Sequence, residues 1–184
     1  QHKLRVNGAE LAYFERGTRR DDLPSLFFVH ATGFHGRVWD YHAEAFPDHH
    51  IIALEQRGHG RSEKLPVTDW RTFGEDMAAV VAALDLRGLI GIGHSMGAHA
   101  MIDGAAISGG FNRLLLLDPT VAEESAYGPE YQAAFGATLH PAAKRRNHFA
   151  SVEEMIQSLG PKSSFPVFHP RIFRDYCQYG LQRA

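Results

Sequence analysis

The stretch that decides the fold reads Leu89-Ile90-Gly91-Ile92-Gly93-His94-Ser95-Met96-Gly97. Its first four residues form a short apolar run typical of a buried strand, and the small residues from Ala98 to Ile107 favour a helix. Ser95 therefore lies at the apex of a sharp turn, in the pattern Gly-x-Ser-x-Gly. Gly93 and Gly97 suit that turn, because the chain on both sides of the apex passes close to neighbouring backbone. The pattern predicts a nucleophilic hydroxyl; the alternative is a turn that merely joins strand to helix.

Backbone donors are expected on two sides of this turn. The Met96 N–H lies at the start of the predicted helix, where unpaired donors and the positive end of the helix dipole face the hydroxyl. The loop His30-Ala31-Thr32-Gly33-Phe34 follows the apolar run 26–29. A glycine-bearing loop at the end of a central strand can aim N–H groups at one point and so stabilise an oxyanion. The alternative is a plain loop in which His30 bonds the backbone.

Strands and helices alternate through the first 119 residues. Asn7-Gly8 predicts a hairpin between strands 3–6 and 10–15. Four apolar runs predict buried strands, and three segments between them predict helices: 26–29, 51–54, 89–92 and 113–117 for the strands, 38–46, 72–86 and 96–107 for the helices. This order predicts the α/β class, with a mostly parallel sheet covered by helices on both faces. Ligand sites in such sheets lie at the carboxyl ends of strands, where Ser95, Asp118 and the 30–34 loop all fall.

The segment after Pro119 differs in character. We expect residues 1–119 to form the core and residues 120–184 a helical cap over the strand ends, with a bundle packed elsewhere as the alternative. Helices are predicted over 129–135, 141–149, 151–159 and 171–179, and Ser151 with Glu154 forms a capping box. Four aromatic residues of this segment are candidate pocket walls, because lids shape the choice of substrate: Phe135, Phe149, Phe165 and Phe168.

Composition excludes several classes of function. The 184 residues suffice for one domain with a hydrophobic core. The net charge of −2 does not indicate binding to nucleic acid or to a membrane surface. No apolar run approaches the roughly 18 residues that span a bilayer. The single cysteine, Cys177, permits a reducing compartment, so we expect a cytoplasmic protein. The 12 histidines show no metal-ligand spacing, so we expect no metal and no cofactor.

The loop 55–62 allows two interpretations. Arg57, His59 and Arg61 could bind an anion. Phosphate-binding loops run directly into a helix, however, whereas Lys64-Leu65-Pro66 follows here. A structural turn beside the site is therefore favoured.

Four segments in this order and spacing resemble the α/β-hydrolase superfamily, in its branch of esterase-like and lipase-like enzymes with a helical cap: residues 30–34, 55–62, 93–97 and 115–119. The resemblance implies that Ser95 attacks the acyl carbon of a small ester. It also implies that the N–H groups of Met96 and of one residue in the first loop hold the oxyanion. Thr32 is favoured by position, with Gly33 and Phe34 as alternatives. A histidine would activate the serine, and an acid would orient that histidine.

The sequence departs from the family pattern at several positions. Ala31 stands where the family has glycine, and Glu55 where it has aspartate. Only six strands are predicted, whereas the family has about eight, and its acid and histidine follow the last two. We therefore expect this chain to be a fragment, with Asp118 as a secondary candidate acid. Five histidines of this chain are the remaining candidates for the base. His140, His148 and His169 lie in the expected cap, and His94 and His99 lie beside the turn, where His94 is expected to point away from Ser95.

Three functions remain open at this point. The first is a serine hydrolase that cleaves a small carboxylic ester, with a small acyl compound as its only expected partner. The second is cofactor-free haloperoxidase-like or C–C hydrolase chemistry on the same scaffold. The third is an inactive scaffold that lacks its base. The sequence leaves the oligomeric state open.

Overall fold

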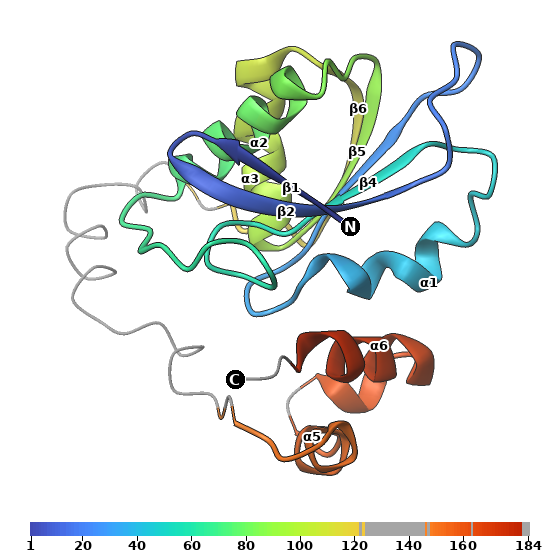
Figure 1. The fold of residues 1–184 in the computed structure, drawn as a ribbon, viewed down its shortest axis with the longest axis vertical. Helices are drawn as coiled ribbons and strands as arrows, with labels where there is room; N and C mark the ends of the chain where they lie inside the picture. Colours follow the sequence, from blue (N-terminus) through green and yellow to red (C-terminus); the bar gives the residue numbers. More distant parts are fainter. Residues whose placement is uncertain (122, 124–145, 147, 163, 182–184) are drawn as a thin grey trace.

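A computed structural model describes residues 1–121, 123, 146, 148–162 and 164–181. Six strands form one sheet in the order β1-β2-β4-β3-β5-β6, in which β1 and β2 are antiparallel and the remaining pairs are parallel (Figure 1). The strands are β1 (His2–Val6), β2 (Ala9–Arg16), β3 (Leu26–Val29), β4 (Ile51–Leu54), β5 (Leu89–His94) and β6 (Phe111–Leu117). The predicted α/β class, the hairpin and all four apolar strands are confirmed.

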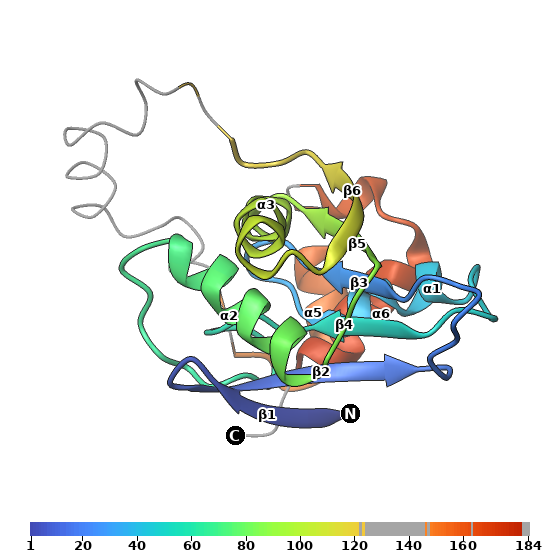
Figure 2. The ribbon, with the colours of Figure 1, turned by 90° about the horizontal axis from the view of Figure 1, so that it is seen from above.

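Helices cover both faces of this sheet, as predicted (Figure 2). One face carries α2 (Arg71–Ala83) and α3 (Met96–Ser108). The other carries the 3-10 helix η1 (Gly36–Trp39), α1 (Asp40–Ala43), α5 (Val152–Leu159) and α6 (Pro170–Gly180), with a second 3-10 helix, η4 (Phe165–Val167), beside them. Among the described residues, no helix is long and apolar enough to cross a membrane.

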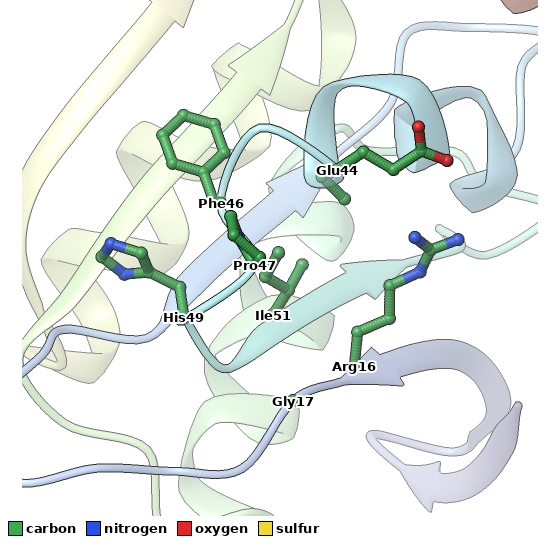
Figure 3. Close-up of a pocket in the computed structure, with 8 residues that line it drawn as sticks. Arg16, Gly17, Glu44, Phe46, Pro47, His49 and Ile51 are labelled. Atoms are coloured by element: carbon green, nitrogen blue, oxygen red, sulfur yellow. The ribbon is translucent and has the colours of Figure 1, made fainter.

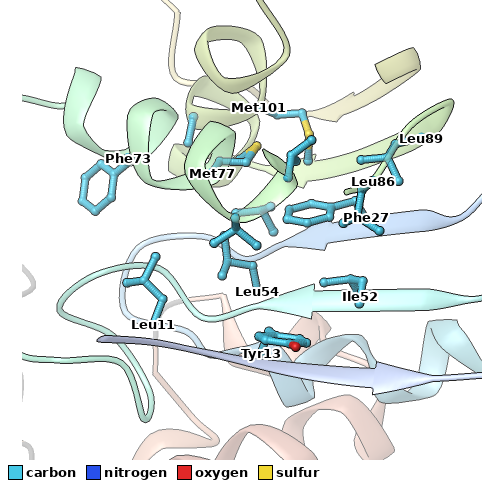
Figure 4. Close-up of a cluster of buried hydrophobic side chains, with 14 of the residues drawn as sticks. Leu11, Tyr13, Phe27, Ile52, Leu54, Phe73, Met77, Leu86, Leu89 and Met101 are labelled. Carbon is cyan, nitrogen blue, oxygen red and sulfur yellow. The ribbon is translucent and has the colours of Figure 1, made fainter. Parts of the chain in front are cut away.

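Successive side chains of each strand point to opposite faces of the sheet, and the core is therefore divided into two clusters. Phe27 and Val29 of β3 point to the α2 and α3 face, where they pack with Met77 and Met101 (Figure 4). Leu26 and Phe28 of the same strand point to the opposite face and join the cluster beneath η1 and α6. Because successive side chains of a strand point to opposite faces, a continuous apolar run predicts a strand covered on both sides. That prediction is confirmed for β3 and β4, whose residues are all buried.

Strand β6 is exposed, whereas its apolar run predicts a buried strand. Leu115 is 54% exposed, and Leu114 and Leu117 are 38% and 40% exposed. The physical reason is position: β6 lies at the edge of the sheet and pairs only with β5 among the described residues. An apolar run identifies a strand, but its burial depends on neighbours that the run itself does not specify.

Helix α2 also differs from its predicted range, 72–86, at both ends. It begins at Arg71, one residue before the predicted start, and the Arg71 N–H donates to the Asp69 carboxylate at 2.9 Å. It ends at Ala83, because Asp85 takes a left-handed conformation with φ of 47° three residues before Gly88. The Arg19 side chain donates to the Leu84 and Asp85 carbonyls at 2.8 and 3.0 Å and so satisfies the end of the helix.

The described part of the C-terminal segment packs against the sheet domain. The Ser151 hydroxyl accepts from the Glu154 N–H at 3.1 Å, which confirms this helix start. Tyr176 and Cys177 of α6 and Met155 of α5 are buried in the cluster that contains Phe28. The predicted helix 129–135 and most of 141–149 lie outside the described residues, and Arg146, His148 and Phe149 are not helical. The boundary between residues 1–119 and 120–184 remains a prediction.

Candidate active site

Ser95 occupies the strained turn that its sequence pattern predicts. Its φ and ψ are 53° and −119°, a conformation that costs a non-glycine residue about 1–3 kcal/mol. A Cβ on Gly93 would lie 2.7 Å from the Ala98 Cα, and a Cβ on Gly97 would lie 2.5 Å from the His30 carbonyl oxygen. Both distances are too short for any side chain, so both glycines are required by close backbone approach.

The Ser95 backbone is fixed by strand β6 and by helix α3. Its N–H donates to the Leu117 carbonyl at 2.9 Å, and its carbonyl accepts from the Ala98 and His99 N–H groups at 2.9 and 3.0 Å. The Ser95 Oγ lies 3.3 Å from the Thr120 Oγ1. In the part of the chain that the structure describes, no histidine nitrogen forms a hydrogen bond with this hydroxyl.

The two residues that carry the candidate oxyanion donors contact each other through their side chains. The Thr32 hydroxyl donates to the Met96 Sδ at 3.3 Å, which places the two residues in contact. The N–H groups of Met96, Thr32 and Gly33 have no acceptor among the described residues, as free oxyanion donors require. Phe34 is different, because its N–H donates to the Ala31 carbonyl at 3.1 Å. The Phe34 alternative is therefore wrong, and Thr32 and Gly33 remain.

His30 has a structural position beneath this loop. It is fully buried, and its Nδ1 lies 2.9 Å from the Ala31 carbonyl oxygen, so Nδ1 carries the proton. Its Nε2 accepts from the Gln56 N–H at 3.1 Å. Burial, with a smaller effect of neighbouring His59, holds the pKa of His30 well below its ordinary value and keeps the ring neutral. His30 thus ties the end of β3 to the loop after β4.

The 55–62 loop is held by two ion pairs, one to helix α2 and one within the loop. The Arg57 guanidinium bonds both Asp76 carboxylate oxygens, at 2.8 and 2.6 Å. The Arg61 Nη1 lies 3.0 Å from the buried Glu55 carboxylate, which also accepts from the Gly36 N–H at 3.2 Å. Because both guanidinium groups already face carboxylates, the structure supports a structural turn rather than an anion site.

An apolar hollow of about 350 Å³ lies at the carboxyl ends of β3, β5 and β6. Aromatic side chains form much of its wall, including Phe34, Trp39 and Phe168, and His94 and Asp118 also line it. Phe34 and Phe168 stack with ring centroids 5.9 Å apart. Of the four predicted pocket walls, Phe168 lines this hollow, Phe149 and Phe165 pack in the adjacent core, and Phe135 lies outside the described residues.

A second hollow, of about 290 Å³, lies at the opposite end of the sheet (Figure 3). It is lined by Arg16 at the end of β2, Ile51 at the start of β4, and Glu44, Phe46 and His49 between α1 and β4. Parallel strands carry their sites at the carboxyl ends, so this amino-end hollow is not part of the Ser95 site.

The candidate acid and bases are placed as follows. Asp118 follows β6 with a left-handed φ of 47° and is exposed. His94 lines the apolar hollow, with its ring centroid 6.5 Å from that of Phe34. His169 stacks on Tyr41 at 4.4 Å and caps α6 by accepting from the Arg171 N–H. His148 is described without a contact to Ser95, and His140 lies outside the described residues.

Sequence reasoning missed Thr120 and the partner of His99. The His99 Nδ1 lies 3.0 Å from the Thr120 carbonyl oxygen, so this ring faces the segment after β6. The only sequence signal for Thr120 was its place just beyond the end of a strand, next to Asp118-Pro119.

Curated relatives match part of the chain. A non-heme chloroperoxidase from Streptomyces lividans is 41% identical over 95 residues, which are 50% of this chain and 33% of that protein. A bifunctional esterase/perhydrolase from Acinetobacter calcoaceticus is 33% identical over 94 residues, again 50% of this chain and 33% of the relative. The matched stretch thus spans about a third of the length of these relatives.

Two solved structures match nearly the whole chain. The E-2-(acetamidomethylene)succinate hydrolase has a TM-score of 0.74 at 20% identity, covering 98% of this chain and 64% of its own. The thioesterase domain from the curacin biosynthetic pathway has a TM-score of 0.73 at 20% identity, covering 100% of this chain and 68% of its own. At this identity the likeness concerns the fold alone. The sequence profile of the alpha/beta hydrolase family matches residues 26–182, and the chain therefore belongs to that family.

Proposed function

We propose that the chain carries the nucleophile and the oxyanion donors of a serine hydrolase that cleaves small carboxylic esters. One observation carries this proposal: Ser95 lies on a strained turn at the start of α3, directly before Met96, and Met96 contacts Thr32, so that two residues whose N–H groups have no acceptor among the described residues lie next to the turn. A turn that only joined strand to helix would have no need of this conformation or of two unpaired donors.

The reaction follows from these positions. The Ser95 Oγ attacks the acyl carbon, and its proton passes to a histidine base outside the described residues. The carbonyl oxygen becomes an oxyanion held by the Met96 N–H and by the Thr32 or Gly33 N–H. Losing one such donor typically costs on the order of 3 kcal/mol of barrier. The alcohol leaves with the proton, and water then releases the acid from Ser95. Asp118 is the candidate acid within this chain.

The apolar hollow supports an uncharged acyl group as the part of the substrate that binds. Its aromatic wall, with Phe34, Trp39 and Phe168, lies beside the strand end that carries Ser95. The expected partner is thus a small molecule, and the net charge of −2 favours neither nucleic acid nor a membrane surface. A buried free Cys177 suits a reducing compartment such as the cytoplasm.

A fluorophosphonate probe on the full-length protein tests the proposal. We expect covalent labelling at Ser95, located by peptide mass spectrometry, and loss of both labelling and ester turnover in Ser95→Ala. Ser108→Ala, at the far end of α3, is the matched control and should change neither. An unlabelled, folded wild-type protein would instead favour the inactive scaffold.

A second candidate function is suggested by the relatives whose names include chloroperoxidase and perhydrolase. In that case the acyl group on Ser95 passes to hydrogen peroxide instead of water and leaves as a peracid. Peracid formation from a short carboxylic acid and hydrogen peroxide, compared with ester hydrolysis by the same preparation, distinguishes the two acceptors. Both activities require Ser95, so Ser95→Ala should abolish both.

A further inference from the structure

The last residue of β6 and the segment after it are attached to the serine turn at three points. The Leu117 carbonyl accepts from the Ser95 N–H at 2.9 Å, and the Thr120 N–H lies 3.5 Å from the Ser95 carbonyl oxygen. The third contact joins the two side chains, with the Thr120 Oγ1 3.3 Å from the Ser95 Oγ. The Thr120 hydroxyl is therefore placed by backbone pairing beside the candidate reacting atom.

His99 holds Thr120 from the other side. It lies one helical turn after Ser95 on α3, and its Nδ1 is 3.0 Å from the Thr120 carbonyl oxygen. A carbonyl only accepts, so Nδ1–H is the donor. The His99 Nε2 lies 3.7 Å from the Asp103 carboxylate, and the Trp70 and His99 rings pack edge to face with centroids 5.3 Å apart. With Nδ1 occupied and Nε2 directed at Asp103, His99 is placed to position Thr120 rather than to accept the serine proton.

We propose that Thr120 donates a hydrogen bond to the Ser95 Oγ during attack, and that His99 positions Thr120 for this task. This inference rests on the proposed function of Ser95. In the resting state either hydroxyl can donate. As the Ser95 proton moves to the base, the Ser95 Oγ can only accept, so Thr120 becomes the donor to an atom that gains negative charge until its bond to the acyl carbon forms and the charge passes to the carbonyl oxygen. Such a bond is stronger in the transition state than in the ground state, and it therefore acts on kcat rather than on KM.

The 3.3 Å separation is compatible with this role, because catalytic hydrogen bonds are often long before substrate binds. Thr120 is exposed, so its methyl group contributes little to packing. A substitution that removes only the hydroxyl should therefore leave the fold intact.

The first experiment does not require hydrolase activity. In a Ser95→Cys background, the rate of alkylation by iodoacetamide against pH measures the pKa of the introduced thiol. A neighbouring donor stabilises the thiolate, so adding Thr120→Val should raise this pKa by about one unit, whereas Thr120→Ser should leave it unchanged. Burial raises the pKa of Cys177 to about 11, so this native cysteine contributes little background. Thr68→Val, an exposed threonine in the loop before α2, is the matched control.

The second experiment measures ester turnover in the full-length protein with Ser95 intact. Thr120→Val should lower kcat about tenfold with KM unchanged, and Thr120→Ser should restore it to within about twofold. His99→Leu should lower kcat by a smaller factor, and His99→Asn, whose amide can donate from the Nδ1 position, should recover most of it. Because both residues act through one hydrogen bond, adding His99→Leu to Thr120→Val should have no further effect on kcat.

Two outcomes would overturn the inference. One is equal thiol pKa values with and without the Thr120 hydroxyl, and the other is a Thr120→Ser enzyme as slow as Thr120→Val. A protein that turns over no ester yet shows the shift in thiol pKa would overturn the proposed function and leave the Thr120 contact supported.

Discussion

Two serines of this molecule have opposite surroundings. Ser25 donates to or accepts from the His50 Nδ1 at 2.8 Å, and the His50 Nε2 lies 2.8 Å from the Glu15 carboxylate. Serine, histidine and acid thus form a hydrogen-bonded series at the amino ends of β3 and β4. Ser95 lies at the carboxyl end of β5, and no described histidine bonds its hydroxyl.

The surroundings of Ser25 nevertheless favour a structural role. Ser25 and His50 are 6% and 5% exposed, so substrate has no access to either. The Ser25 carbonyl accepts from the Ile90 N–H at 3.0 Å and the His50 carbonyl accepts from the Leu26 N–H at 2.9 Å, which places both residues in the regular pairing of strand ends. His50 thus connects β2 to the start of β3.

The difference teaches what makes a serine a nucleophile. A hydrogen-bonded histidine and acid are not sufficient, because the hydroxyl must also be reachable and must face donors for the developing negative charge. Ser95 has a strained turn and free N–H groups nearby, whereas Ser25 has only the hydrogen-bond partners.

The largest contrast is expected between Ser95→Ala and Ser25→Ala. Loss of a nucleophile lowers turnover by several orders of magnitude, about 10⁶-fold in well-studied serine enzymes. Ser95→Ala should therefore remove measurable ester turnover without lowering the melting temperature. Ser25→Ala should keep kcat/KM within about twofold and destabilise the fold by about 1–2 kcal/mol, because it leaves a buried His50 nitrogen unpaired. Denaturant unfolding and ester assays on both variants measure the contrast, and a catalytic loss in Ser25→Ala would contradict it.

Gly97→Ala should have the next largest effect, because it changes the turn without touching the hydroxyl. The added Cβ would lie within 2.6 Å of the Val29 and His30 carbonyl oxygens, so α3 must move away from β3. We expect at least about 100-fold lower kcat/KM and about 2–4 kcal/mol lower stability.

Gly109→Ala is the control for this change at the other end of α3. A Cβ there meets nothing within 4 Å, although its φ of 62° carries modest strain. It should cost about 1 kcal/mol of stability and no activity. Equal kinetic effects of the two alanine variants would show that the close approach at Gly97 does not matter.

Acid pH should weaken the structure that carries the candidate oxyanion loop. Burial lowers the pKa of His30, His35 and His59 in the folded protein, so the unfolded chain binds more protons as pH falls below about 6.5. Stability should thus be complete above that pH and decline below it, by up to about 1.4 kcal/mol per pH unit for each histidine that remains neutral when folded. Urea unfolding between pH 7.5 and 5 measures this slope, and His59→Gln should reduce it. A stability that rises toward pH 5 would contradict the prediction.

The turn that carries Ser95 and the central strands could be predicted because their signals are local. Residues 26–29 and 51–54 are apolar throughout, and Gly93 and Gly97 flank Ser95 at fixed spacing. The exposure of β6 could not be predicted, because burial depends on what lies beyond the edge of the sheet.

The hydrogen bonds within the site could not be predicted from the sequence either. The Phe34 N–H is excluded as an oxyanion donor by a turn with Ala31, which leaves no mark in the residue types. Thr120 meets Ser95 across 25 positions of the chain, and no motif joins them. Ser25 and His50 are also 25 positions apart and meet because β3 and β4 lie side by side.

The smallest effect is expected at the acid of the Ser25 series. In serine enzymes, replacing the acid of the triad by its amide lowers kcat by about 10⁴-fold, because the histidine takes the wrong tautomer. Glu15→Gln should instead leave ester turnover unchanged, since His50 serves no reaction. The amide oxygen can still accept from the His50 Nε2, and the Glu15 side chain is 37% exposed, so the stability loss should stay below about 1 kcal/mol.

His50→Leu is the more destabilising variant for comparison, because it removes both hydrogen bonds at once. We expect kcat to be the same in Glu15→Gln and His50→Leu and the urea midpoint to be lower in His50→Leu. A drop in kcat for Glu15→Gln beyond about tenfold would mean that the amino-end series acts on the site, and the contrast between the two serines would then fail.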